Sequence, residues 1–275
     1  MSQLFFPLVY KGGGSSMKPM PCHVLDLSTH NFYAENKNIN LQKAKDEGIL
    51  AVAIRATVGL YKDPRTTDIY NAAKEVGIAP TFYHVSVPNY PEISQMDNFF
   101  RHIDGLDYEW SLALDNELHN NEGNERISHV IWYGFDRMKK ESDFIPINYT
   151  RQSWWDHYVN PWSGWPQYKL FPARYDSYFN PYLISPWSDN RYKFRDYDNW
   201  VLWQAYADHP NNEQGKRYGV DSTNVDIDIF NGTEEELKVY LGIGVTPPDP
   251  PPNLTLEERV FNLENCTYLN HPECL

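Results

Sequence analysis

The sequence predicts an α/β protein whose strands close into a barrel, and three features lead to this prediction. Strand patterns alternate with helix patterns along the first half of the chain, which indicates a parallel sheet. Eight segments have the pattern of strands, with helices only between the early ones, so the last part of the barrel is expected to be irregular. The 275 residues suffice for one large domain of this kind.

An open, doubly wound sheet is the alternative arrangement. No Gly-x-Gly-x-x-Gly follows the first predicted strand, so a bound dinucleotide is not expected. In a barrel, the loops at the C-terminal ends of the strands carry the site. The polar residues that follow each strand are therefore the candidates for function.

The first half of the chain contains four strands, each followed by a helix. The strands are short apolar runs over residues 23–28, 51–57, 80–85 and 112–117. The helices that follow them cover residues 41–47, 67–76, 93–103 and 125–140. Gly48 and Gly77 end the first two helices, because glycine adopts the left-handed conformation that closes a helix. The fourth helix places Ile127, Val130 and Phe135 on one face, which is expected to pack on the sheet.

The rhythm changes after the fifth strand, which covers residues 145–150. The next fifty or so residues are rich in Trp, Tyr, Pro and Asp and show little helical periodicity. Apolar runs then predict strands over 169–175, 200–206 and 224–230, and a closing helix over 234–240.

Four segments of different composition divide the chain. Residues 1–20, with a Gly-Gly-Gly-Ser-Ser run, are expected to be a tail and flexible linker. Residues 21–243 form the barrel, and the Pro-rich segment 244–252 is a stiff linker. The tail 253–275 has apolar residues near helical spacing. It is either a short helix for docking or self-association, or a tail packed against the barrel.

Composition excludes several classes of function. The net charge of -13 and pI of about 5.1 argue against a nucleic-acid partner, since phosphates favour basic surfaces. No segment is long and apolar enough to span a membrane, and no signal peptide is expected. No metal site is predicted, because the sequence has no Cys-x-x-Cys and no His pair at ligand spacing. Cys266 and Cys274 are either a disulfide or two free thiols, with Cys22 left over.

Asp115 and Glu117 are the central candidates for chemistry. Residues i and i+2 of a strand face the same way, which places their Cα atoms about 6–7 Å apart. Two carboxyls held that close resist ionising together, so one is expected to keep its proton to a higher pH. A protonated carboxyl beside an ionised one is the equipment of glycoside hydrolysis. The alternative is a pair of solvated loop acids.

Eight stretches, each at a predicted strand end and in the same order, resemble glycoside hydrolase family 25, the Chalaropsis-type lysozymes. They are Val24-Leu-Asp-Leu-Ser-Thr-His-Asn31, Ile54-Arg-Ala-Thr-Val-Gly59, Phe82-Tyr-His84, Ala113-Leu-Asp-Asn-Glu117, Ile147-Asn-Tyr-Thr150, Leu170-Phe-Pro-Ala-Arg-Tyr175, Trp200-Val-Leu-Trp-Gln204 and Asn224-Val-Asp-Ile-Asp-Ile-Phe-Asn-Gly232. The resemblance implies a TIM-like barrel of the (β/α)5β3 type with an acidic groove at its mouth. It also implies a lysozyme that cleaves the β-1,4 bond between N-acetylmuramic acid and N-acetylglucosamine in peptidoglycan. No cofactor is expected.

The resemblance assigns roles to four acids. Glu117 matches the general acid that protonates the glycosidic oxygen. Asp115 matches the partner that orients the 2-acetamido group of the substrate, which acts as an internal nucleophile and gives net retention. Asp26 and Asp226 match two further groove acids that raise the proton affinity of Glu117.

Five further residues are expected to bind the substrate. Tyr83, Tyr149 and Trp203 match aromatic residues that line the groove, and Gln204 and Asn31 are placed to bond sugar hydroxyls or amides. Such an enzyme acts on the cell wall, after secretion or after release by lysis.

The sequence departs from the family pattern at Val58, Pro172 and Asn116, where the family commonly has a polar, an apolar or aromatic, and an aliphatic residue. Two other functions remain open. One is a module that binds the cell wall without hydrolysis, and the other is a glycosidase acting on another amino-sugar polymer such as chitin.

Overall fold

The computed structural model describes residues 24–33, 35–36, 38–175, 192–206 and 214–244. The strands in this part of the chain are β1 (Val24–Leu27), β2 (Ala51–Val58), β3 (Tyr61–Lys62), β4 (Ala79–Val85), β5 (Ala113–Asp115), β6 (Ile147–Thr150), β7 (Lys169–Pro172), β8 (Leu202–Tyr206) and β9 (Asp226–Phe230). The helices are α1 (Gln42–Asp46), α2 (Thr66–Val76), α3 (Glu92–Ile103), α4 (Asn124–Glu141), α5 (Gln152–Tyr158), α6 (Gln214–Tyr218) and α7 (Glu234–Tyr240), with short 3-10 turns η1 (Thr29–Asn31) and η2 (Trp165–Gln167). The three cysteines and the two predicted tails lie outside the described residues.

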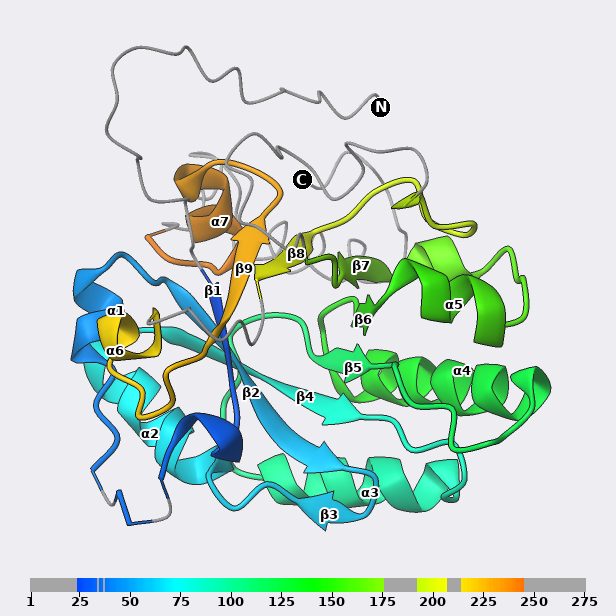
Figure 1. The fold of residues 1–275 in the computed structure, drawn as a ribbon, viewed down its shortest axis with the longest axis horizontal. Coiled ribbons are helices and arrows are strands. Elements are labelled where there is room, and N and C mark those ends of the chain that lie inside the picture. The colour runs from blue at the N-terminus through cyan, green and yellow to red at the C-terminus, as the bar shows by residue number, and fades with distance from the viewer. Residues whose placement is uncertain (1–23, 34, 37, 176–191, 207–213, 245–275) are drawn as a thin grey trace, which may run out of the picture.

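The strands form one sheet in the order β7-β6-β5-β4-β2-β1-β9-β8, and β3 pairs with β2 outside this path. Strands β1, β2 and β4 to β7 run parallel, whereas β9 is antiparallel to both β1 and β8. The two ends of the sheet meet, because the Val201 amide donates to the Leu170 carbonyl at 2.8 Å and Ala173 forms a parallel bridge with Gln204. The sheet is therefore a nearly closed, eight-stranded barrel, with helices on its outside (Figure 1).

The predicted fold class is confirmed, although three elements, α5, α6 and β3, were not predicted. Five strands are each followed by a helix, and β7, β8 and β9 complete the ring, which is the (β/α)5β3 pattern. Helix α5 was not predicted, because it lies in the aromatic-rich segment after β6, which shows little helical periodicity. It forms because Trp154 and Trp155 are buried against the barrel. The two-residue strand β3, which folds back on β2, was also missed.

Successive residues of a strand point to opposite faces of the sheet, so they belong in turn to two apolar layers. On β2, Val52 and Ile54 belong to the outer layer, which contains helix residues such as Phe99 and Phe135. Ala51 and its alternate neighbours belong to a second layer inside the barrel. Inward-facing positions can therefore be identified from the layer that each strand residue joins.

Helix α7 covers the end of the barrel where the parallel strands begin (Figure 1). Its Leu237 and Leu241, the residue that ends it, pack into the inner layer. The Tyr240 hydroxyl lies 2.8 Å from Ser111 Oγ and 3.1 Å from Lys169 Nζ. The N-terminal end of the barrel is thus closed by side chains, and the functional candidates lie at the other end.

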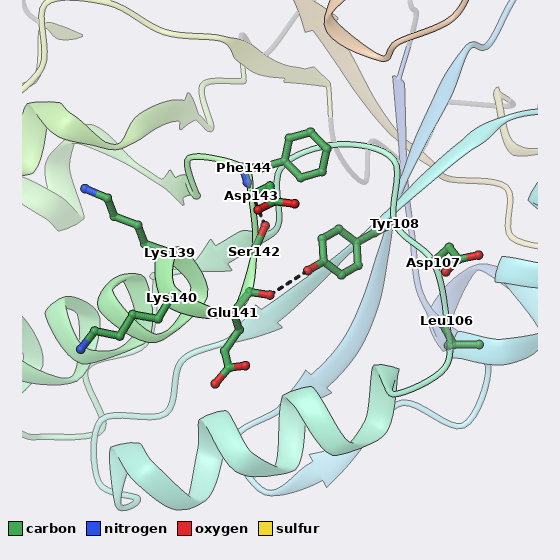
Figure 2. A pocket seen from close by; sticks show the side chains of 9 residues that line it. All are labelled: Leu106, Asp107, Tyr108, Lys139, Lys140, Glu141, Ser142, Asp143 and Phe144. Carbon is green, nitrogen blue, oxygen red and sulfur yellow. Dashed lines mark hydrogen bonds between the residues drawn. The ribbon is translucent and has the colours of Figure 1, made fainter. Parts of the chain in front are cut away.

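A separate pocket of about 480 Å³ lies beside the segments that lead into β5 and β6 (Figure 2). Tyr108 crosses it and donates a hydrogen bond from its hydroxyl to the Glu141 carbonyl at 3.3 Å. Both segments precede their strands, so this pocket is at the opposite end of the barrel from the residues that follow them.

Candidate active site

Acidic side chains from three strands meet at the C-terminal end of the barrel. Asp26 on β1 lies directly opposite Asp226 on the antiparallel strand β9. Asp115 ends β5, and the charge of Asp26 acts on it. Glu117 follows two residues later, and its charge acts on both Asp26 and Asp115. Asp226 joins the group through Asp228, whose proton affinity is raised by Asp26 and Asp226.

Asp26 is held in a balance of opposing effects. Its pKa is raised to about 7, mainly by burial and in part by the charge of Glu117. A hydrogen bond from Tyr83 and the positive charge of Arg55 act in the opposite direction. Asp26 therefore changes its charge near neutral pH, unlike an ordinary aspartate.

Asp115, the first of the two acids predicted as a pair, has a strongly shifted pKa. Its side chain is buried, and its Oδ1 has no hydrogen-bond partner among the described residues. Burial raises its pKa well above the usual range, and the charges of Glu117 and Asp26 add to this effect. Within this pair, Asp115 is the buried acid whose protonated form is favoured, and Glu117 is the partly exposed one.

Glu117 lies beyond the end of β5, yet the chain stays aligned as far as this residue. The Asn116 amide donates to the Tyr149 carbonyl at 2.9 Å, and Thr150 Oγ1 donates to the Asn116 carbonyl at 2.7 Å. These bonds extend the pairing with β6 and turn Glu117 to the same side as Asp115. Its side chain is 34% exposed, and Oε2 lies 3.8 Å from Arg151 Nε.

Asn116 faces the opposite side of the chain, toward the helices. Its Nδ2 donates to Asn148 Oδ1 at 2.9 Å, and Asn148 Nδ2 donates to the Tyr197 hydroxyl at 3.0 Å. This departure from the family pattern is thus matched by a second amide on β6. It does not enter the acidic group.

Asp228 is a buried acid that the sequence analysis did not single out. It is fully buried, and both carboxyl oxygens have no hydrogen-bond partner within the described part of the chain. Burial raises its pKa well above the usual range, and the charges of Asp26 and Asp226 add smaller increases. The alternation along β9 could have identified it, because Asp226, Asp228 and Phe230 are two residues apart and share a face.

Gln204 connects two tyrosines beside the acids. Its Oε1 accepts hydrogen bonds from the Tyr149 hydroxyl at 2.6 Å and from the Tyr175 hydroxyl at 2.5 Å. Gln204 and Tyr149 are buried, whereas Tyr175 is exposed. Tyr149 lies opposite Asp115 in the register of β5 and β6, so this cluster forms one wall of the acidic group.

Trp203 and Asn31 are not brought into this group. Trp203 is buried in the outer layer, on the opposite face of β8 from Gln204, and packs against Trp200. The Asn31 side chain caps the η1 turn, where Oδ1 accepts from the Ser28 amide at 2.8 Å. Its Nδ2 points to the Asn224 carbonyl at 3.4 Å. Both side chains are occupied in holding the fold.

Two arginines bring positive charge to the acids. Arg55 donates from Nε to Asp63 Oδ2 at 2.9 Å, and Asp63 also accepts from the amide of Thr29 at 3.0 Å. Arg151, which follows β6, is half exposed and faces Glu117. Both lower the pKa of Asp115, although less than burial raises it.

The described residues contain no group of three or more His, Cys, Asp or Glu arranged to hold a metal ion. Within the same ranges, every helix is too short or too polar to cross a membrane. The site contains carboxyls whose protonated forms are favoured, Asp26, Asp115 and Asp228, beside the partly exposed Glu117, and it is suited to moving a proton to and from a bound molecule.

Comparison with known proteins identifies relatives of this barrel. Residues 26–214 match the model of the glycosyl hydrolases family 25. The autolytic lysozyme of Clostridium acetobutylicum is 32% identical over 116 residues, which cover 42% of this chain and 33% of that protein. Lysozyme M1 of Streptomyces globisporus is 26% identical over 222 residues, covering 73% of this chain and 66% of that protein. This chain thus spans only about a third of the length of the Clostridium relative.

Solved structures share the fold. A family 25 glycosyl hydrolase from Bacillus anthracis superposes with a TM-score of 0.62 at 17% identity, over 84% of this chain and 100% of that one. A muramidase from Trichobolus zukalii superposes with a TM-score of 0.61 at 23% identity, over 79% and 97% of the two chains.

Proposed function

This chain belongs to glycosyl hydrolase family 25, and from this premise we propose that it is a lysozyme that hydrolyses the glycan strands of peptidoglycan. The bond cleaved is the β-1,4 linkage between N-acetylmuramic acid and N-acetylglucosamine. The observation that carries the proposal is the meeting of Asp26, Asp115, Glu117 and Asp226 at one end of the barrel. The lysozyme names of two relatives support it.

In this proposal, Asp115 and Glu117 share one proton. Buried Asp115 holds it in the free protein, and Glu117 is the member that is open to a ligand. When the proton is on Glu117, that residue can protonate the glycosidic oxygen. Asp115 is then ionised and accepts the N–H of the 2-acetamido group, whose oxygen attacks the anomeric carbon.

The second half of the reaction returns the proton. Glu117, now ionised, removes a proton from water as the water opens the cyclic intermediate. Attack from the face that the leaving group vacated gives net retention of configuration. A proton NMR spectrum recorded during the reaction tests this step, because a retaining enzyme releases the β anomer first.

Asp26 and Asp226 keep the shared proton in the group, since negative charges nearby favour the protonated forms of their neighbours. Tyr83, through its bond to Asp26, and Tyr149, opposite Asp115, form the floor of the groove. Gln204 is fully buried, so its proposed role is to orient Tyr149 and Tyr175 toward the sugar.

The domain division and place of action extend the proposal. The barrel of residues 21–243 is the catalytic unit, and its substrate is in the cell wall, reached by secretion or by lysis. The linker 244–252 and the tail 253–275 lie outside the described residues, so docking through the tail stays a prediction.

Mass analysis of soluble products tests the function directly. The protein is incubated with purified peptidoglycan and, separately, with chitin oligosaccharides. A muramidase releases muropeptides with reducing N-acetylmuramic acid ends and leaves chitin intact. Reducing N-acetylglucosamine ends from chitin would instead favour a glycosidase of another class. Binding to the cell wall without any product would favour a non-hydrolytic module.

A further inference from the structure

We propose that Arg151 recognises the anionic lactyl side chain of N-acetylmuramic acid, an inference that rests on the proposed function. Arg151 follows β6 directly and lies at the same end of the barrel as the acids. Its Nε is 3.8 Å from Glu117 Oε2, beyond hydrogen-bonding distance, and its side chain is 50% exposed. A cation is therefore presented to solvent beside the residue that we assign as the general acid.

Two other arginines at this end of the barrel are already engaged. Arg55 is only 16% exposed and is paired with the buried Asp63. The Arg174 guanidinium stacks on the Tyr192 ring, 3.9 Å from its centroid. Arg151 differs from both, because its ion pair with Glu117 is long and leaves the guanidinium edges open to a ligand.

A groove built from carboxyls repels an anionic substrate, and the whole chain carries a net charge of -13. N-acetylmuramic acid differs from N-acetylglucosamine by a lactyl ether on O3, which ends in a carboxylate when no peptide is attached. A guanidinium pairs with a carboxylate through two parallel hydrogen bonds. An acidic site that accepts this sugar therefore needs a cation, and among the described residues Arg151 is placed to supply it.

The position beside Glu117 fits the chemistry of the sugar. Glu117 acts on the oxygen bonded to C1 of the muramic acid residue, and the lactyl group is attached to C3 of the same ring. A residue next to Glu117 is therefore within reach of the group that distinguishes cell-wall glycan from chitin. Where a peptide is attached, the same side chain can donate to the lactyl carbonyl.

Arg151 could instead affect cleavage only by its electrostatic effect on Glu117. Two matched substrates distinguish this role from recognition of the lactyl carboxylate. The first is a tetrasaccharide of alternating N-acetylglucosamine and N-acetylmuramic acid with free lactyl carboxylates. The second is the same tetrasaccharide with the lactyl groups as methyl esters. An effect through Glu117 changes cleavage of both equally, whereas recognition of the carboxylate changes only the first.

The proteins compared are the wild type, Arg151→Gln, Arg151→Lys and the control Arg101→Gln, which removes one exposed positive charge on α3. We expect Arg151→Gln to lower kcat/KM for the free acid about 10- to 100-fold, the contribution of charge-assisted hydrogen bonds. Its kcat/KM for the ester should change less than about threefold. Arg151→Lys should retain part of the preference, and Arg101→Gln should match the wild type.

An equal loss on both substrates, or a wild type that does not distinguish acid from ester, would overturn the inference. If the wild type cleaves neither, the proposed hydrolysis fails, and calorimetric titration with the same tetrasaccharides decides the question of recognition. Acid-selective binding that Arg151→Gln abolishes would support it without catalysis. Equal binding of acid and ester, or no binding, would refute it.

Discussion

Asp26 and Asp226 lie directly opposite each other where β1 and β9 pair in antiparallel register, so two carboxyls occupy one cross-strand position. Like charges at such a position are unfavourable, and Asp228 lies two residues farther along the same face of β9. Burial and mutual repulsion therefore favour the protonated forms of Asp26 and Asp228. Several consequences can be measured.

Replacement of Asp228 by Asn should stabilise the protein at neutral and alkaline pH. The folded state raises the pKa of this buried acid above its unfolded value of about 3.9, so its contribution to stability is complete below about pH 4 and is lost as the pH rises. Removing the titration should increase the free energy of unfolding at pH 8 by roughly 1–3 kcal/mol.

Urea unfolding at pH 4 and pH 8 measures this effect. Asp104→Asn, at an exposed position that ends α3, is the matched control and should shift neither midpoint. An Asp228→Asn protein that is less stable than the wild type at pH 8 would show that the buried acid has a stabilising partner.

Cleavage should weaken as the pH rises through about 7, where Asp26 loses its proton. The new negative charge helps to hold the shared proton but repels an anionic substrate, and we expect the repulsion to dominate. The bond from Tyr83 lowers the pKa of Asp26, so Tyr83→Phe should move the alkaline limb of kcat/KM upward by about one pH unit. The pH profile measures this. Tyr133→Phe, on the outer helix α4, serves as control. If the alkaline limb of Tyr83→Phe stays in place, the titration of Asp26 is not the cause of the loss of activity at high pH.

Asn116→Leu, which restores the aliphatic residue common in the family, should destabilise the protein. It removes the donor to Asn148 Oδ1, a buried acceptor, at a cost of about 1–3 kcal/mol. Thermal unfolding of Asn116→Leu, Asn148→Leu and the double variant forms a cycle. The double variant should lose less than the sum of the single losses, and strict additivity would mean that the two amides do not interact.

Digestion of intact cell walls should become faster when salt is raised from about 10 mM to about 150 mM, since screening weakens repulsion between an acidic protein and an anionic wall. The net charge of -13 sets the sign of this effect. The rate at which a suspension of cell walls loses turbidity is measured across ionic strengths. A rate that is flat or falls over this range would indicate that attraction at the groove outweighs the charge of the whole chain.

Much of the barrel was predictable from the sequence. Its strands show alternation between two faces, and its longer helices place their apolar residues on one face. Glu117 could be placed from the sequence only as part of a strand, whereas the structure ends β5 at Asp115 and aligns Glu117 through bonds from Asn116 and Thr150. Such side-chain anchoring leaves no periodic signal. Strand β3 was missed because two residues are too few for one, and helix α5 was missed because its aromatic-rich segment has no clear helical period.

The alternation of residues along β8 and β9 also identifies two side-chain orientations that were not predicted. Gln204 faces the acids, so Trp203, its neighbour on β8, has to face the outer layer. The same rule places Asp228 beside Asp226. By contrast, Arg55 pairs with Asp63, and Asn31 caps the η1 turn. Both contacts involve side chains and loops, so the spacing of residues along the sequence does not predict them.

The central claim is that Glu117 donates a proton to the glycosidic oxygen, and Glu117→Gln tests it most directly. Glutamine keeps the shape of the side chain but cannot supply the proton. Release of reducing ends from purified peptidoglycan should fall by about 100- to 10,000-fold, while circular dichroism and binding to the cell wall stay unchanged. A folded Glu117→Gln protein that releases reducing ends at the wild-type rate would contradict the account.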